Sequence, residues 1–136
     1  MAGDKIFVLD TSALLTLRED GLGSDEVEAR ILQAQKQQCR LLVSFMTRME
    51  ILYLVRREEN ETAAHETLRL IDSFPIEWIS CELEILEGAS LLKSGGGLSV
   101  ADSWIAATAL VHQATLVHKD PEFSKLKNIP QQILGR

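Results

Sequence analysis

Four acidic side chains stand in or beside strongly apolar segments of this sequence and are its best candidates for chemistry. Asp10 and Asp120 each follow an apolar run, Glu50 lies inside one, and Asp102 opens an alanine-rich segment. A carboxylate in apolar surroundings costs free energy unless it is paired, protonated or bound to a cation. Because few basic residues stand beside these acids, together they predict a site for a hard divalent metal, Mg²⁺ or Mn²⁺.

Helix capping explains each of the three aspartates when it is taken alone. Asp10 precedes a predicted helix, and an N-cap aspartate stabilises a helix by about 1 kcal/mol. The segment from Ser99 to Asp102 fits a capping box, and Asp120 before Pro121 is a good N-cap. Capping therefore remains an alternative to metal binding for these residues.

Glu50 requires a different explanation, because the predicted helix around it, residues 46–57, is apolar almost all round. A helix of this kind is expected to be buried. Its one inward acid then needs a partner, which is either a metal or an arginine such as Arg48 or Arg56.

Short apolar strands alternate with helical segments along the chain, which predicts an α/β fold. Continuously apolar strands are typical of a mostly parallel sheet, here of four to five strands flanked by helices. Ligands bind such sheets beyond the carboxyl ends of the strands, where Asp10 and Asp120 fall. Strands are predicted at 5–9, 40–44, 75–79, 114–117 and 132–134, and helices at 13–17, 24–38, 46–57, 60–73, 82–93 and 99–112.

Size and composition predict one globular domain, residues 1–136, in the cytoplasm. The chain is 46% hydrophobic and 25% charged, and it shows neither a cationic leader nor a run long enough to span a membrane. Cys39 and Cys81 lack metal-type spacing and are interpreted as reduced thiols. The net charge of −6 argues against binding nucleic acid by bulk electrostatics. It is compatible with a nuclease, since a metal would neutralise the clustered acids.

The segments around the four acids resemble those of the PIN-domain ribonucleases, and in particular the VapC-type toxins of bacterial toxin–antitoxin pairs. Residues 8–15 look like the family's first motif, and Glu50 matches its second acid. Residues 98–109 are similar to its third motif, and residues 114–123 to its last. The resemblance covers nearly the whole chain, and the four motifs occur in the family's order.

This resemblance implies a PIN-like fold and a metal-dependent endoribonuclease. It implies Asp10 and Asp102 as metal ligands and Asp120 as the residue that completes the metal shell. Glu50 would orient or deprotonate the attacking water, and Ser12 would support Asp10 or touch the scissile phosphate. The implied partners are an RNA substrate, a cognate antitoxin and a second copy of the chain in a homodimer.

Two positions depart from the family's pattern. Many relatives carry Thr or Ser where His118 stands, and Asp where Glu122 stands. His118 is interpreted either as part of the surroundings of the metal or as a partly exposed histidine at a strand end. Glu122 keeps the negative charge on a longer side chain and is a candidate fifth acid.

Three other functions remain open from the sequence. The same acids would serve a PIN ribonuclease in RNA processing, and the fold alone would serve an interaction module without catalysis. A phosphotransferase would use Asp10 as a covalent nucleophile. Such families tend to place a second acid two residues later, where this chain has Ser12.

Overall fold

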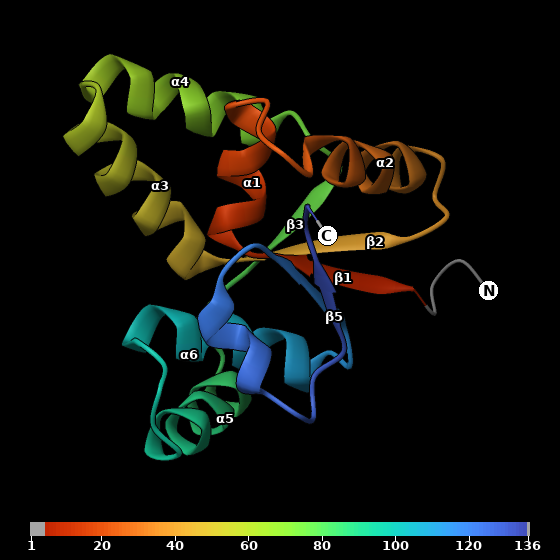
Figure 1. Cartoon of the computed structure of the whole chain (residues 1–136), viewed down its shortest axis with the longest axis vertical. Helices are drawn as coiled ribbons and strands as arrows, with labels where there is room; N and C mark the ends of the chain where they lie inside the picture. The colour runs from red at the N-terminus through yellow and green to blue at the C-terminus, as the bar shows by residue number, and fades with distance from the viewer. Residues whose placement is uncertain (1–4, 136) are drawn as a thin grey trace.

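The computed structural model describes residues 5–135, and it contains one five-stranded sheet between two layers of helices (Figure 1). Every pair of neighbouring strands is parallel, so the predicted sheet is confirmed and is wholly rather than mostly parallel. The spatial order is β3-β2-β1-β4-β5. The strands are β1 (Ile6–Leu9), β2 (Arg40–Ser44), β3 (Ile76–Ile79), β4 (Thr115–His118) and β5 (Gln131–Ile133).

Helices cover both faces of the sheet because successive strand residues point to opposite sides. Leu9 and Leu41 pack against one helical layer, whereas Val8 and Leu42 pack against the other. The layer above the sheet in Figure 1 contains α1 (Thr11–Arg18), α2 (Ser24–Gln35), α3 (Phe45–Glu58) and α4 (Glu61–Asp72). Below the sheet lie α5 (Leu83–Ser94), α6 (Val100–Val111) and a 3₁₀ turn, η2 (Pro121–Lys125).

Helix α1 begins earlier than the sequence predicted. It starts at Thr11 instead of residue 13, because Asp10 caps it directly: the Asp10 carboxylate accepts the backbone N–H of Ser12 at 3.1 Å. The strand therefore passes into the helix without an intervening loop, and Asp10 is held at their junction.

Helix α3 is less buried than its composition predicted. Its buried residues are Thr47, Ile51 and Val55, whereas Met49 and Tyr53 are 50% and 36% exposed. The prediction of a buried helix holds for one face of α3 only, because α3 lies at the outer edge of its layer (Figure 1). Only the side of α3 that faces the core is covered by neighbouring elements.

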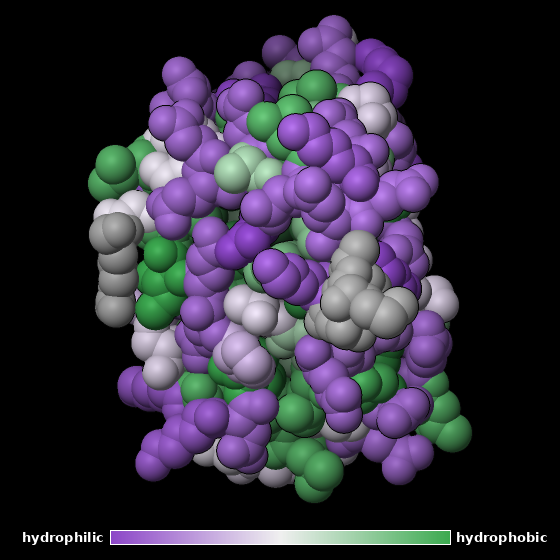
Figure 2. All heavy atoms as spheres, turned by 90° about the vertical axis from the view of Figure 1, so that its right-hand side faces the viewer, coloured by the Kyte–Doolittle hydropathy of each residue, from purple (hydrophilic) through white to green (hydrophobic). Residues whose placement is uncertain are grey.

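The two ends of the parallel sheet differ in character. Figure 2 shows the end at which the chain enters β1, and its surface is mostly hydrophilic. Hydrophobic atoms gather on that face mainly in its lower part, at the level of α5 and α6. The carboxyl ends of the strands lie on the other side, and the predicted acids lie there.

Two further expectations concern the chain as a whole. Among residues 5–135, no helix is both long enough and apolar enough to cross a membrane. Cys39 is buried, Cys81 is exposed, and both are free thiols.

Candidate metal centre

Neighbouring strands and the helices that follow them bring the four predicted acids together. Asp10 directly follows β1, and Asp120 lies two residues beyond β4, which is the neighbour of β1 in the sheet. Asp102 comes from the first turn of α6, and Glu50 from the middle of α3. Residues that are far apart in the sequence therefore meet at the carboxyl edge of the sheet.

The acids form two overlapping groups. One carboxylate oxygen each from Asp10, Glu50 and Asp102 lie within 4.8 Å of one another, and we name these residues the buried group. The same holds for Asp102, Asp120 and Glu122, which we name the turn group because Asp120 caps the η2 turn and Glu122 belongs to it. Asp102 is common to both. The turn thus brings in Glu122, whose role the sequence left open.

Burial dominates the electrostatics of Asp10. Its residue surface is 3% exposed, and burial raises the pKa of its carboxyl to about 6. Hydrogen bonds from Ser12 favour the charged form and oppose the rise, while the nearby Glu50 carboxylate adds to it. Asp10 is therefore an acid that loses its proton reluctantly when no cation is near.

Burial also dominates the electrostatics of Asp102, which is 8% exposed, and the rise in pKa is larger there than at Asp10. Burial raises the pKa of Asp102 to about 8, with further contributions from a hydrogen bond with Glu122 and from the charges of Asp10, Asp120 and Glu50. Burial also raises the pKa of Glu50. A divalent cation would relieve this repulsion, and carboxylate oxygens are ligands that Mg²⁺ and Mn²⁺ prefer. The donor set therefore fits such an ion.

Thr11, and not an arginine, is the partner of Glu50. The Thr11 hydroxyl donates to Glu50 Oε1 at 2.7 Å, which leaves Thr11 Oγ1 to accept from the fully buried Thr47 at 3.0 Å. Arg48 and Arg56 form ion pairs with acids of α4 instead. The arginine alternative for Glu50 is therefore wrong, because both side chains are directed to the neighbouring helix.

Sequence reasoning missed Thr11 and Thr47 as parts of this site. Thr47 stands three residues before Glu50, so both lie on one face of α3. Thr11 stands next to Asp10 in the first motif. These spacings were a usable signal for the two threonines, although they could not reveal that the two segments meet.

The hydrogen bond expected between Ser12 and Asp10 is present. Ser12 Oγ donates to Asp10 Oδ2 at 2.6 Å and accepts the backbone N–H of Lys119 at 2.9 Å. Ser12 therefore connects the end of β1 to the segment that follows β4, and it restricts the orientation of the Asp10 carboxylate.

Capping and the acidic cluster coexist at the aspartates. Asp120 caps the η2 turn by accepting the Glu122 N–H at 2.9 Å through one of its two oxygens. Ser99 Oγ accepts the Asp102 N–H at 3.1 Å, which is one half of the predicted capping box. Within residues 5–135, the other half of the capping box, in which the Ser99 N–H would donate to the Asp102 carboxylate, is absent. The Asp102 carboxylate instead lies among the other acids.

The interpretation of His118 as a partly exposed histidine at a strand end is wrong. It ends β4 and is fully buried. Its Nδ1 accepts the backbone N–H of Asp120 at 3.1 Å, and its Nε2 lies 2.7 Å from Oε1 of Gln131. His118 therefore contacts the segment that carries the turn group.

Comparison with known proteins places the chain in a family. The family model of the PIN domain matches residues 7–129, and the chain therefore belongs to the PIN domain family. No curated protein sequence matches the chain.

Solved structures of VapC toxins and VapBC complexes share the fold. VapBC2 from Rickettsia felis, bound to a DNA fragment from its promoter, is 19% identical, with a TM-score of 0.75 over 95% of this chain and 98% of that chain. DNA-bound VapBC from Salmonella typhimurium is 18% identical, with a TM-score of 0.73 over 94% of this chain and 97% of that one. VapC20 from Mycobacterium tuberculosis, described as a Sarcin-Ricin loop cleaving toxin, is 18% identical, with a TM-score of 0.70 over 92% and 97%.

Proposed function

We propose that this protein is a metal-dependent endoribonuclease and the toxin of a type II toxin–antitoxin pair. The observation that carries the proposal is the convergence of Asp10, Glu50, Asp102 and Asp120 at one edge of the sheet of a PIN domain. The similarity to VapC20, described as a Sarcin-Ricin loop cleaving toxin, supports RNA as the substrate.

In this proposal each acid has a separate task. Asp10 and Asp102 would hold Mg²⁺ or Mn²⁺, and Asp120 would complete the shell. The bound ion would polarise a phosphoryl oxygen and acidify water. Glu50, which is hydrogen-bonded by Thr11 and lies near Asp10 and Asp102, would orient the attacking water and take its proton. Attack by the water oxygen on phosphorus would break the bond to O3′, and O3′ would take a proton from solvent, which leaves a 5′-phosphate and a 3′-hydroxyl.

The protonation behaviour of Glu50 suits a general base. Burial raises its pKa above the ordinary value, and the hydrogen bond from Thr11 limits the rise. A carboxylate with a raised pKa accepts a proton more readily near neutral pH than an ordinary carboxylate does. This supports Glu50, which is partly buried, as the residue that removes the proton.

The proposed antitoxin follows from the charge of the site and from the similar structures. The solved structures with this fold include a toxin–antitoxin complex from Klebsiella pneumoniae and a member of the VapBC family of toxin–antitoxin systems from Mycobacterium tuberculosis, which supports a cognate antitoxin for this chain. The two acidic groups meet at Asp102 and make one negatively charged region. A basic segment of an antitoxin would complement that charge.

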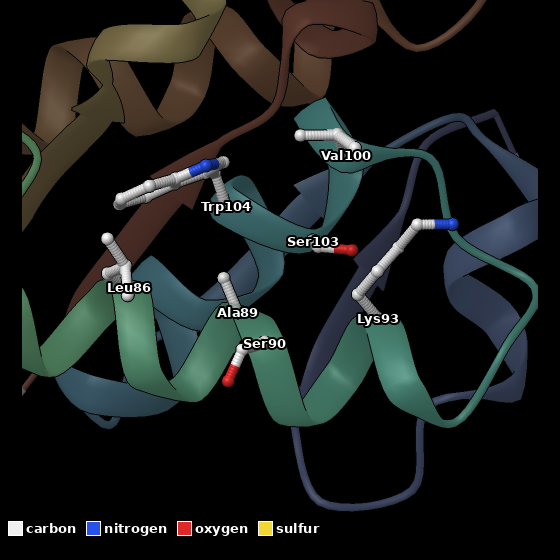
Figure 3. A pocket seen from close by; sticks show the side chains of 7 residues that line it. All are labelled: Leu86, Ala89, Ser90, Lys93, Val100, Ser103 and Trp104. Carbon is white, nitrogen blue, oxygen red and sulfur yellow. The ribbon is translucent and has the colours of Figure 1, made fainter.

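The proposed homodimer has a candidate contact surface on α5 and α6. Leu86 and Val100 are 46% and 60% exposed, and they border a cavity of about 280 Å³ between these helices. Trp104 reaches into the same region, while the Lys93 ammonium turns away to the Leu98 carbonyl, 2.9 Å from its Nζ (Figure 3). Exposed apolar surface of this kind favours association. The cavity is lined by Leu86, Ala89, Ser90, Lys93, Val100, Ser103 and Trp104.

Gel filtration at micromolar concentration tests the dimer. The unmodified chain should elute as a dimer, and Leu86→Asp should elute as a monomer because it places a charge in the apolar surface. Leu32→Asp, at an exposed leucine of α2, is the matched control and should remain dimeric. A monomeric unmodified chain would contradict the proposed homodimer.

Cleavage of a mixed RNA pool tests the enzyme. Purified protein is incubated with Mg²⁺, with Mn²⁺ or with a chelator, beside the double variant Asp10→Asn, Asp102→Asn. Metal-dependent cutting that the double variant lacks supports the nuclease, and Asp25→Asn, an exposed residue of α2, should cut normally. Absence of cutting and of metal binding in every condition would instead favour the interaction module. A phosphorylated Asp10 would identify a phosphotransferase.

Expression in a bacterial host separates the two nuclease roles. Growth arrest that depends on Asp10 supports the toxin, whereas unaffected growth supports a PIN ribonuclease in RNA processing. The proposal treats residues 1–136 as a single domain that acts in the cytoplasm.

A further inference from the structure

His118 and Gln131 form a hydrogen-bonded clasp beside the turn group, and the proposed reaction uses neither residue. His118 ends β4 and Gln131 begins β5, and these two strands are paired in the sheet. The His118 ring is fully buried, and Gln131 is half-buried. A buried imidazole and amide of this kind must find hydrogen-bond partners, and the partners reveal what the pair does.

The contacts of the Gln131 amide determine its orientation. Its Nε2 donates to the main-chain carbonyls of Phe123 at 2.8 Å and of Leu126 at 3.0 Å. Its Oε1 therefore faces His118 Nε2, at 2.7 Å. Because an amide oxygen can only accept, His118 Nε2 carries the proton of this hydrogen bond.

The other ring nitrogen of His118 leads independently to the same tautomer. Nδ1 lies 3.1 Å from the backbone nitrogen of Asp120, which can only donate. Nδ1 must then be unprotonated. Two separate contacts thus select one neutral form of His118, with the proton on Nε2.

The clasp holds the η2 turn at both ends. Asp120 precedes the turn and is bound by His118, whereas Gln131 binds the carbonyl of Phe123, in the middle of the turn, and that of Leu126, just after it. The buried Phe123 ring also packs edge-on against the His118 ring, with centroids 5.0 Å apart. A turn of five residues has few hydrogen bonds of its own, so these contacts largely decide where it lies.

We infer that His118 and Gln131 are positioning residues, which place Asp120 and Glu122 beside Asp102 and so build the turn group. Asp120 is itself held by His118, and Glu122 stands between Asp120 and the carbonyls that Gln131 binds. Loosening either end would let the two carboxylates move away from Asp102, because repulsion between like charges already pushes them apart. The inference rests on the proposed function, because it concerns the same metal centre.

Two substitutions at His118 separate the two ends of the clasp. His118→Asn keeps an amide oxygen near the position of Nδ1, where it can accept the Asp120 N–H, but it loses the contact with Gln131. His118→Gln keeps a donor near the position of Nε2 but loses the acceptor for Asp120. His65→Gln changes an exposed histidine of α4 and is the matched control.

The measurements are Mn²⁺ binding by calorimetry, kcat and KM for RNA cleavage, and thermal stability. His118→Gln is expected to weaken Mn²⁺ binding about 10- to 100-fold and to lower kcat more than it raises KM. His118→Asn is expected to regain part of the affinity, and His65→Gln to bind as the unmodified chain does. A purely structural histidine would lower the melting temperature of both variants and leave Mn²⁺ affinity unchanged in the folded protein, which would overturn the inference.

Two further measurements keep the result decisive. Nitrogen-15 NMR of the unmodified protein should find His118 protonated at Nε2 and not at Nδ1, and the opposite tautomer would overturn the clasp. If the His118 variants fail to fold, Gln131→Met is the substitute, because it removes the hydrogen bonds of Gln131 and keeps a similar side-chain volume. It should weaken Mn²⁺ binding. If the protein binds Mn²⁺ but cuts no RNA, the proposed nuclease is refuted. The Mn²⁺ affinities of the variants then still test the role of the clasp. An unmodified protein that binds no Mn²⁺ would overturn both.

Discussion

The buried group and the turn group contribute to one centre but are held in different ways. Asp10 sits at the junction of a central strand and a helix, and Glu50 stands on α3, a helix of 14 residues. Asp120 and Glu122 depend on a 3₁₀ turn of five residues. The first arrangement follows from the main elements of the fold, whereas the second needs the side chains of His118 and Gln131. Strands and helices therefore hold one part of the acidic centre, whereas a short turn and two side chains hold the other.

The two groups also differ in how much water surrounds them. Asp10 is buried, whereas Glu122 is exposed at the surface of the turn. Like charges repel more strongly where water is excluded. The buried group therefore gains more from a bound cation, and substitutions in it should have the larger effects.

The largest effect is expected for Asp102→Asn, because Asp102 belongs to both groups. Loss of a shared ligand should remove several kcal/mol of charge stabilisation, so RNA cleavage with Mn²⁺ should fall about a thousandfold or more. Single-turnover cleavage measures this, with Asp25→Asn as the control. Activity within tenfold of the unmodified chain would show that neither group depends on Asp102.

The second prediction compares one glutamate from each group. Glu50→Gln should lower kcat about 100-fold or more through loss of the base, with little change in Mn²⁺ affinity. Glu122→Gln should lower kcat about tenfold at most, because the exposed turn leaves water to replace the lost contact. Steady-state cleavage by both variants decides the order. A larger loss for Glu122→Gln would reverse the assignment of the groups.

The third prediction concerns pH. The pKa values of Asp10 and Asp102 are raised to about 6 and about 8 in the folded chain, from an ordinary value of 3.8. At pH values between the ordinary pKa and the raised pKa of each acid, the folded state binds more protons than the unfolded state. The unfolding free energy in chelator should therefore fall as pH rises from about 4 to about 8.

Chemical denaturation from pH 5 to pH 9 measures that slope. Asp10→Asn should reduce the slope below about pH 6, whereas Asp102→Asn should reduce it over the whole range up to about pH 8. Saturating Mn²⁺ should flatten the slope, because binding to the folded state stabilises it where the acids are charged. An unfolding free energy that rises with pH in chelator would contradict the burial and charge repulsion that raise the pKa values of Asp10 and Asp102.

The smallest effect is expected for Thr11→Val, which leaves the acids in place. Loss of the hydroxyl removes the donor to Glu50 and leaves the buried Thr47 without its acceptor, at a cost of about 1–3 kcal/mol in unfolding free energy. Because the Thr11 hydrogen bond lowers the pKa of Glu50, the acid limb of the cleavage profile should move to higher pH. Thr11→Ser keeps the hydroxyl and should keep the profile. An unmoved limb in Thr11→Val would separate Thr11 from the base.

Much of the frame was predictable because its signals are local. A parallel strand covered on both sides must be apolar along its whole length, so residues 40–44 were recognised and coincide with β2. The caps at Asp10 and Asp120 come from side chains that accept the backbone N–H of a residue just beyond them. Parallel strand order then places strand ends at one edge, which is why the four acids could be proposed together.

The contacts that complete the centre were decided only by the tertiary structure. Glu50 takes its hydrogen bond from Thr11, 39 positions away, whereas neighbouring arginines pair with α4. The exposed face of α3 and the buried ring of His118 depend likewise on which elements pack against them. The sequence by itself determined the elements, their caps and the acids at their ends, because those depend on adjacent residues. The partner of each acid and the position of the turn depend on which faces meet in space, and only the folded chain decides that.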